Sequence, residues 1–360
     1  MRIAIVGGSN SVIATGYVGS FIKHLSMLTG ESIDLENAST GGTTSLTSVA
    51  RLSEIKHAPD VIVFEYSLND TGHLNHRPDG SHFKRLFLEL FCCAAAERFP
   101  DAKIVPLILA ANPFYSMNVA NIVYDAELDW FASHGISCVD TRRWFVETFG
   151  YPAPAFLYSD DAHFHRRCAV AMIGTLLAER VNAARTQGPA LREIGKPIYW
   201  PSLGKHLRPK FYAANEIASL AGRASSVAEV KNRHVQTECL RLAAGENLAF
   251  RTKGFPIALT MASTNDHRYV ALRAAGASIS FATRYLDIPE GKFLYSSIPL
   301  LILDPAFANG THDGEHRIFL STPKSSNAAN VVTFDGFDAA AVNQASENQL
   351  NLIGVLCMEE

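Results

Sequence analysis

The sequence predicts an α/β domain with a parallel sheet, followed by a second domain made mainly of short β-strands. Three observations lead to this fold class. The chain has 360 residues, of which 48% are hydrophobic and 19% charged, so it can bury more than one core. Residues 1–185 alternate apolar runs of strand length with longer stretches at helical spacing. After residues 186–189, TQGP, the helical spacing largely gives way to short apolar runs separated by turns.

The first half alternates strand and helix signals along its whole length. The strand signals are short, apolar and β-branched, which is typical of central parallel strands. We expect strands at 2–6, 32–36, 61–66, 103–110 and 136–140. We expect helices at 12–28, 45–55, 83–99, 119–134 and 165–185. Repeated βα units of this kind favour a doubly wound parallel sheet with helices on both faces.

The second half has the pattern of a β-sandwich of jelly-roll-like type. We expect strands at 238–242, 247–252, 257–262, 269–273, 278–285, 298–303, 317–321, 331–334 and 350–357. The predicted domain organisation is therefore an α/β domain at 1–185, a connector at 186–235 and a β-rich domain at 236–360.

Charge, cysteine content and hydropathy indicate the environment in which the protein works. The formal net charge is -3 and no basic stripe is present, so nucleic-acid binding is not expected. None of the six cysteines forms a CxxC pair, which favours free thiols in a reducing compartment. No leader-like segment precedes the first strand, and no apolar run reaches the roughly 18 residues of a membrane span. We therefore expect a cytoplasmic protein without a membrane span.

The first stretch with chemical potential is 7–11, GGSNS, between the first strand and the first helix. A strand, a glycine turn and a hydroxyl at the start of a helix would place Ser9 at the carboxyl edge of the sheet. Either Ser9 is then a nucleophile that needs a base, or one of Ser9, Asn10 and Ser11 is simply the N-cap of the helix. The glycines do not form GxGxxG, which argues against a dinucleotide site.

Two further stretches lie after the next predicted strands. In residues 37–44, NASTGGTT, Gly42 could aim a backbone N–H at a ligand, or the stretch could be an ordinary turn. In residues 67–70, SLND, Asn69 could point its amide into the crevice, or the Asn-Asp pair could form a turn.

The fourth stretch, SDDAHFH at 159–165, precedes the last helix of the first half. Asp160 and His163 are three residues apart, so the carboxylate can hold one ring nitrogen and leave the other to act as a base. Alternatively, an aspartate caps the helix, or Asp160, Asp161, His163 and His165 bind a metal.

In this order, the four stretches resemble the sequence blocks of the SGNH hydrolases, the GDSL esterase and lipase superfamily, over residues 1–185. The GDSxS-like block stands as 7–11, the second block ends at Gly42, the GxND block stands as 67–70, and the DxxH block stands as 160–163. Three positions depart from the family pattern. Gly8 replaces the usual aspartate, Ser67 replaces glycine, and Phe164 follows the histidine where proline is frequent.

The resemblance implies a flavodoxin-like three-layer domain that carries out serine acyl transfer, with no cofactor or metal. Ser9 would be the nucleophile, His163 its base and Asp160 the residue that orients His163. The oxyanion hole would consist of the Ser9 and Gly42 backbone N–H groups and the Asn69 side chain. The expected substrate is a small-molecule or glycan ester, with an O-acetyl group on a carbohydrate preferred, and either water or an alcohol would accept the acyl group.

A binding or scaffold protein is the alternative function. In that case the SGNH-like domain would be catalytically inert and the β-rich domain would recognise a glycan. Aromatic residues of the second half could form a sugar-stacking platform or belong to the core; they are Trp200, Tyr212, Tyr269, Tyr285 and Tyr295.

Overall fold

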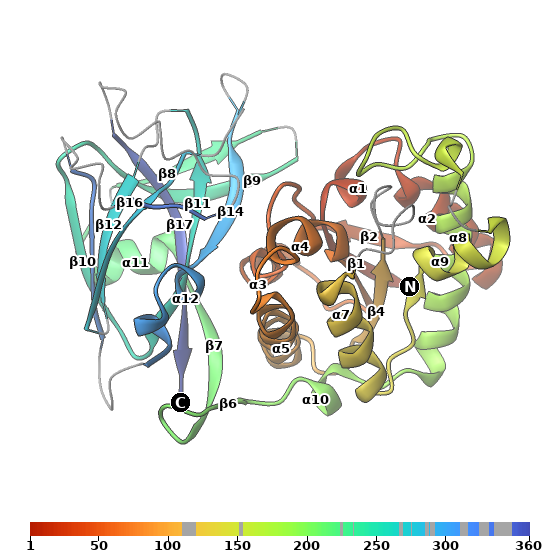
Figure 1. Ribbon diagram of the computed structural model, residues 1–360, viewed down its shortest axis with the longest axis horizontal. Coiled ribbons are helices and arrows are strands. Elements are labelled where there is room, and N and C mark those ends of the chain that lie inside the picture. The colour runs from red at the N-terminus through yellow and green to blue at the C-terminus, as the bar shows by residue number, and fades with distance from the viewer. Residues whose placement is uncertain are drawn as a thin grey trace. The chain divides into compact units, whose positions relative to one another are not determined.

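The structure is a computed structural model of the chain. It describes residues 1–109, 120–150, 154–223, 226–232, 234–265, 269–274, 276–284, 288, 292–309, 316–323, 331–334 and 348–360. The chain divides into two compact units, Met1–Lys196 and Pro197–Glu360 (Figure 1). No helix in the described ranges is long and apolar enough to cross a membrane.

The first unit is built on a five-stranded parallel sheet with the order β2-β1-β3-β4-β5. Its strands are β1 (Arg2–Gly7), β2 (Asp34–Asn37), β3 (Val61–Glu65), β4 (Lys103–Ile108) and β5 (Val139–Asp140). The central strands β1 and β3 are buried almost throughout, as expected where helices cover both faces of a parallel sheet. The predicted doubly wound parallel sheet is confirmed.

Helices cover both faces of this sheet (Figure 1). The helical segments of the first unit are α1 (Ser9–Val12), α2 (Tyr17–Thr29), α3 (Thr47–Arg51), η1 (Leu52–Glu54), α4 (Ser67–Leu74), α5 (Gly80–Arg98), α7 (Ile122–Ser133), α8 (Thr141–Phe149), η2 (Ala155–Leu157), α9 (Ala169–Gln187) and α10 (Leu191–Ile194). Strand residues such as Ile3 and Val61 share one core cluster with α2 and α9. Phe64 points to the opposite face, where its ring packs 4.7 Å from that of Phe91 on α5.

The structure corrects the predicted helices in two ways. The helix expected at 12–28 begins only at Tyr17, as α2, because the short helix α1 ends at Val12 and the chain turns before Gly16; a Cβ at Gly16 would lie 2.7 Å from the Asn10 carbonyl oxygen. The structure also contains α4 and α8, which the sequence did not predict. Helix α4 occupies the SLND stretch, so the alternative of a simple turn there is wrong.

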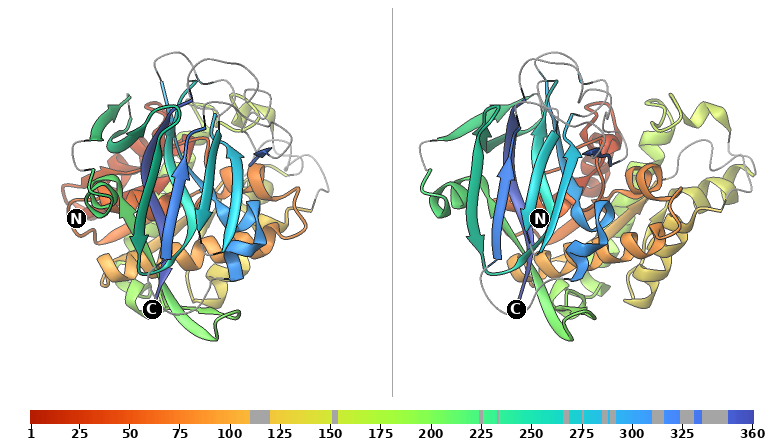
Figure 2. Two further views of the ribbon diagram at one scale, coloured as in Figure 1. Left: turned by 90° about the vertical axis from the view of Figure 1, so that its left-hand side faces the viewer. Right: turned by 60° about the vertical axis from the view of Figure 1, so that its left-hand side comes forward.

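The second unit contains two largely antiparallel sheets, so the predicted β-rich half is confirmed. Its strands are β6 (Ile198–Trp200), β7 (Lys205–Ala213), β8 (Val227–Lys231), β9 (Gln236–Leu242), β10 (Asn247–Thr252), β11 (Phe255–Ser263), β12 (Tyr269–Ala274), β13 (Ala277–Ala282), β14 (Leu294–Pro299), β15 (His316–Ser321), β16 (Val331–Val332) and β17 (Leu350–Glu359). One sheet has the order β10-β15-β12-β13-β16, and the other has β14-β11-β17-β7-β6, with β9 pairing both β17 and β8. Strands β11 and β17 run side by side and are buried along nearly their whole length, which makes them the centre of this unit (Figure 2).

Helical segments complete the second unit, namely α11 (Ala214–Leu220), α12 (Leu300–Leu303) and η4 (Pro305–Asn309). The strand expected at 298–303 is wrong for most of its length, because β14 ends at Pro299 and 300–303, LLIL, is helical. A short apolar run fits a buried strand and a buried helical turn equally well. Regular elements also fill much of 186–235, where we expected a connector, and β7 pairs with β17 there.

Candidate functional site

Ser9, His163 and Asp160 form one hydrogen-bonded chain. Ser9 is the first residue of α1, one residue after the end of β1, and its Oγ lies 3.0 Å from His163 Nε2. His163 Nδ1 lies 2.9 Å from each carboxylate oxygen of Asp160. The structure thus brings together three predicted residues, one of them 154 positions away from its partner. In this arrangement Nδ1–H donates to Asp160, and Nε2 is left to accept the Ser9 proton.

The Asp160 carboxylate also organises its own loop. Its Oδ1 accepts hydrogen bonds from the backbone N–H groups of Ala162 (2.9 Å) and His163 (2.8 Å). Burial acts to raise the pKa of Asp160, but these N–H groups and the imidazole outweigh it and hold the pKa below its usual range. The carboxylate is therefore ionised at neutral pH and available to orient His163.

The loop is anchored at two points. Asn10 on α1 donates a hydrogen bond from Nδ2 to the Ala162 carbonyl oxygen at 3.0 Å. Phe164, which stands where the family frequently has proline, is buried, and its ring packs against those of Tyr158 (5.0 Å) and Phe145 (5.9 Å). The departure at Phe164 thus supplies an apolar anchor beside the histidine.

Asn69 lies against the turn that carries Ser9. A Cβ at Gly8 would lie 2.0 Å from Asn69 Oδ1, so a larger residue at position 8 would have to displace this amide from its observed position. Asn69 is half-buried, and its side chain makes no hydrogen bond within the described part of the chain. The departure at Gly8 therefore has a steric reason, and the Asn69 amide is available to a ligand.

The glycine loop lies on another side of Ser9. Gly42 has φ of 72°, in the left-handed region that favours glycine. Its neighbour Gly41, which we did not single out from the sequence, lies against Ser9, because a Cβ at Gly41 would lie 2.9 Å from Ser9 Cβ. The TGG pattern was visible in the sequence, but only the fold distinguishes the two glycines.

Buried ionic groups hold this glycine loop in place. The backbone N–H of Ser45 donates to Asp70 Oδ1 at 2.7 Å. Lys84 Nζ on α5 lies 2.7 Å from Asp70 Oδ2 and 2.9 Å from Glu127 Oε1 on α7, and none of these three side chains is more than 1% exposed. Burial opposes the charged form of Lys84, but the two carboxylates raise its pKa above the usual value. Asp70 follows Asn69 directly, so it connects the loop to the helix that carries Asn69.

Ser67, which stands where the family has glycine, has a structural role. Its Oγ donates to the Leu109 carbonyl oxygen at 2.8 Å and accepts from the Leu109 N–H at 2.7 Å. Since Leu109 directly follows β4, a glycine at position 67 would lose this link between α4 and the sheet.

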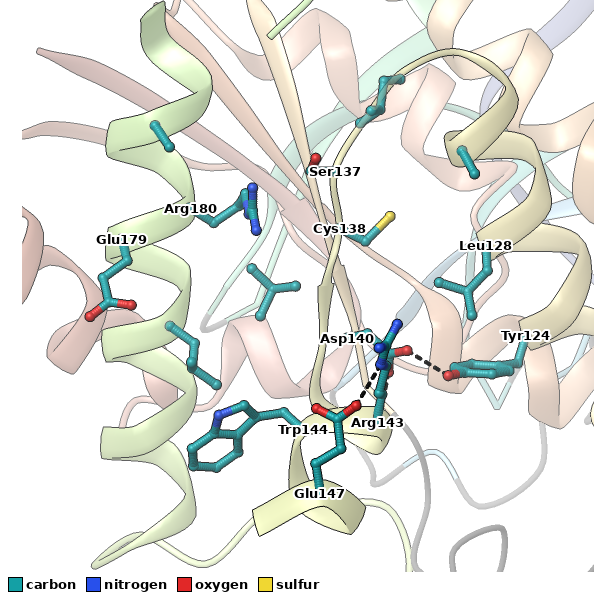
Figure 3. Close-up of a pocket in the computed structure, with 15 residues that line it drawn as sticks. Tyr124, Leu128, Ser137, Cys138, Asp140, Arg143, Trp144, Glu147, Glu179 and Arg180 are labelled. Carbon is teal, nitrogen blue, oxygen red and sulfur yellow. Dashed lines mark hydrogen bonds and ion pairs between the residues drawn. The ribbon is translucent and has the colours of Figure 1, made fainter. Parts of the chain in front are cut away.

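A separate hollow of about 710 Å³ runs along the edge strand β5 (Figure 3). Four of its polar residues form pairs: Arg143 pairs with Glu147 at 2.7 Å, and Asp140 accepts the Tyr124 hydroxyl at 2.6 Å. Neither Ser9 nor His163 lines it, so it is distinct from the hydrogen-bonded chain.

The metal alternative gains no support from the loop geometry. In the ranges that the structure describes, no three His, Cys, Asp or Glu side chains are grouped to hold one ion. His165 Nδ1 instead accepts the N–H of Arg167 at 3.3 Å.

Comparisons with known proteins bear on the fold. No family model matches the sequence, and no curated protein matches it. Among solved structures, a two-domain esterase (CEX) active on acetylated mannans is similar, with a TM-score of 0.64, 14% identity, and coverage of 100% of this chain and 91% of that one. The same esterase co-crystallized with mannopentaose gives a TM-score of 0.60 at 14% identity, with the same coverage of both chains. At this identity the likeness is one of fold, and the first unit is the doubly wound parallel α/β domain that the sequence predicts.

Proposed function

We propose that this chain is a serine esterase that removes O-acyl groups, preferably O-acetyl groups, from a carbohydrate. The single observation that carries the proposal is the hydrogen-bonded chain from Asp160 through His163 to Ser9, with bond lengths of 2.9 and 3.0 Å. An imidazole held in this way can accept the serine proton, which converts a weak nucleophile into a strong one.

In the first half of the proposed reaction, Ser9 Oγ attacks the ester carbonyl carbon while His163 Nε2 takes the hydroxyl proton. The negative oxygen of the tetrahedral intermediate would be stabilised by the N–H groups of Ser9 and Gly42 and by the Asn69 amide. The C–O bond to the leaving alcohol then breaks, the alcohol takes the proton from His163, and the acyl group remains on Ser9.

In the second half, water attacks the acyl-enzyme and gives its proton to His163. The C–O bond to Ser9 breaks, the proton returns to Ser9, and a carboxylic acid leaves. The side chains of Asp160 and His163 are 56% and 31% exposed, so the site admits both water and a bulky substrate. Transfer to an acceptor sugar would use the same acyl-enzyme with an alcohol in place of water.

The carbohydrate part of the proposal draws support from the two-domain esterase, which aligns with the whole of this chain and is described as active on acetylated mannans. The inert-scaffold alternative, in which the second unit would recognise a glycan, gains no sugar-stacking platform from the described residues of that unit. Trp200, Tyr212, Tyr269 and Tyr295 are all buried, and Tyr285 lies outside the described residues. The four described rings are therefore core residues and not a sugar platform.

Replacing Ser9 tests the proposal directly. In Ser9→Ala, turnover of p-nitrophenyl esters and acetylated sugars should fall by a factor on the order of 10⁴ to 10⁶. A fluorophosphonate should label the wild type and not the variant. Ser133→Ala, at the end of α7, is the control and should behave as the wild type. Wild-type turnover in Ser9→Ala would contradict the proposal, and product appearing only with acceptor sugars would assign transfer.

A further inference from the structure

Glu65 lies at the end of β3, beneath the turn that carries Ser9, and is fully buried. Its Oε2 accepts hydrogen bonds from the Gly8 N–H at 3.1 Å and from the Ser11 hydroxyl at 2.7 Å. The Gly8 N–H also lies 2.7 Å from the Glu65 backbone carbonyl oxygen. One residue of β3 therefore holds positions on both sides of Ser9.

The surroundings favour the neutral form of this acid. Burial is the largest effect on Glu65 and raises its pKa to about 8. The hydrogen bonds from Ser11 and Gly8 lower this pKa. The charge of Glu127 raises it, and the charge of Lys84 lowers it. Its Oε1 has no hydrogen-bond partner in the described structure. A buried carboxylate with one bare oxygen is costly, whereas the protonated acid is less so.

Two hydroxyl groups, those of Ser11 and Tyr17, lead to the Glu65 carboxyl group. The Tyr17 hydroxyl donates to Ser11 Oγ at 2.7 Å, and Ser11 in turn donates to Glu65. Burial first and the Glu65 charge second raise the pKa of Tyr17, so this neighbour stays neutral. A Cβ at Gly7 would lie 2.4 Å from Ser11 Oγ and 3.1 Å from Glu65 Cβ. The titratable and charged groups around Glu65 are thus Tyr17, Lys84 and Glu127.

We propose that Glu65 is a positioning residue that holds the Ser9 turn as a neutral acid, and that its ionisation disables the site. The proposal rests on the proposed esterase function. The hydrogen bond reaches Gly8, whose neighbour Ser9 supplies a proposed oxyanion donor. A negative charge beneath that donor would oppose the negative oxygen of the intermediate in a site of low dielectric constant.

The test is the pH dependence of kcat in the wild type and in Glu65→Gln, measured from about pH 6 to 10 with spontaneous hydrolysis subtracted. The wild type should lose activity as the pH rises through about 8, the pKa of Glu65. Glu65→Gln cannot ionise, so it should keep kcat within about five-fold of the wild type at neutral pH and hold it at higher pH. Glu147→Gln, on the exposed surface of α8, is the control and should show the wild-type profile.

A second variant keeps the test decisive if Glu65→Gln folds poorly. Ser11→Ala removes a hydrogen bond that favours the ionised form of Glu65. The fall of kcat at alkaline pH should therefore occur at a higher pH in this variant than in the wild type. If kcat falls at the same alkaline pH in the wild type, Glu65→Gln and Ser11→Ala, the proposal is overturned while the esterase function stands.

Thermal unfolding provides a readout that needs no substrate. The folded-state pKa of Glu65 is raised above the unfolded value of 4.5, so its contribution to stability is full below about pH 4.5 and is lost as the pH rises through about 8. The unfolding temperature of the wild type should fall over this pH range relative to the unfolding temperature of Glu65→Gln. If the unfolding temperatures of the two proteins change equally with pH, the neutral-acid proposal is overturned even if no ester is hydrolysed. Turnover by Ser9→Ala would refute only the esterase function.

Discussion

The two sides of Ser9 differ in how much the surrounding protein constrains them. On the side of the proposed base, here called the base side, Asp160 and His163 lie on a surface loop, and their side chains are 56% and 31% exposed. On the side of the proposed oxyanion donors, here called the donor side, Glu65 and Asp70 are fully buried, and a Cβ at Gly8 would lie 2.0 Å from Asn69 Oδ1. Solvent can partly replace a lost group on the base side. On the donor side, loss of Glu65, Asp70 or their partners leaves a buried group unpaired, so changes there should be more costly.

Lys84→Met should produce the largest effect, and it should appear in stability. The change leaves Asp70 and Glu127 buried without their cation, which typically costs about 3–5 kcal/mol. Urea unfolding measures this loss. Lys23→Met, on the exposed surface of α2, should change the free energy of unfolding by less than about 0.5 kcal/mol.

A double change sharpens this result. Adding Glu127→Leu to Lys84→Met removes one of the unpaired carboxylates and should recover part of the lost stability, because replacing buried charges with apolar groups is often close to neutral. If Lys84→Met alone unfolds at the wild-type urea concentration, the buried ionic cluster does not stabilise the donor side.

Asn69→Ala should lower kcat by about 10² to 10³, the usual cost of one oxyanion donor. Gly8→Ala should approach the same loss without touching Asn69, because the new Cβ must push the Asn69 amide aside. The double variant should then be no worse than Asn69→Ala alone. Gly19→Ala is the matched control, since a Cβ there meets nothing within 4 Å. Independent, multiplying losses at Gly8 and Asn69 would contradict the steric link.

The sequence was most informative where partners lie close along the chain or follow a repeating pattern. The spacing of Asp160 and His163 predicted their hydrogen bond, and the apolar run at 61–66 predicted a buried strand. Ser9 and His163 meet across 154 positions, and the expectation that they do so came from the family resemblance. The sequence could not separate Gly41 from Gly42, because backbone proximity depends on the fold.

The buried acids and the short helices escaped prediction for physical reasons. Lys84 and Glu127 look like ordinary charged residues of amphipathic helices, and their burial depends on how α5 packs on α7. Glu65 merely ends an apolar run. Helix α4 contains a short polar sequence without a repeating apolar face, so local propensity favoured a turn. Tertiary packing decides all of these cases.

Asp160→Ala should lower kcat by about 10²-fold, which is less than a fully enclosed orienting carboxylate would give, because water can solvate the exposed imidazole. Asp161→Ala is the matched control. It removes an adjacent exposed carboxylate for which the described structure has no partner, and it should leave kcat unchanged. An Asp160→Ala loss as large as that of Ser9→Ala would mean that the base side is no more tolerant than the donor side.

Asn10→Ala should give the smallest effect and shows whether the two sides of Ser9 act together. Its amide is the tether from α1 to the Ala162 carbonyl, and one such hydrogen bond contributes about 0.5–1.5 kcal/mol, which corresponds to roughly a two- to ten-fold fall in kcat. Asn75→Ala removes a comparable bond to the Ala120 carbonyl and should leave kcat unchanged. If Asn10→Ala lowers stability but not kcat, His163 keeps its place without the tether, and the Asp160 turn alone positions the base.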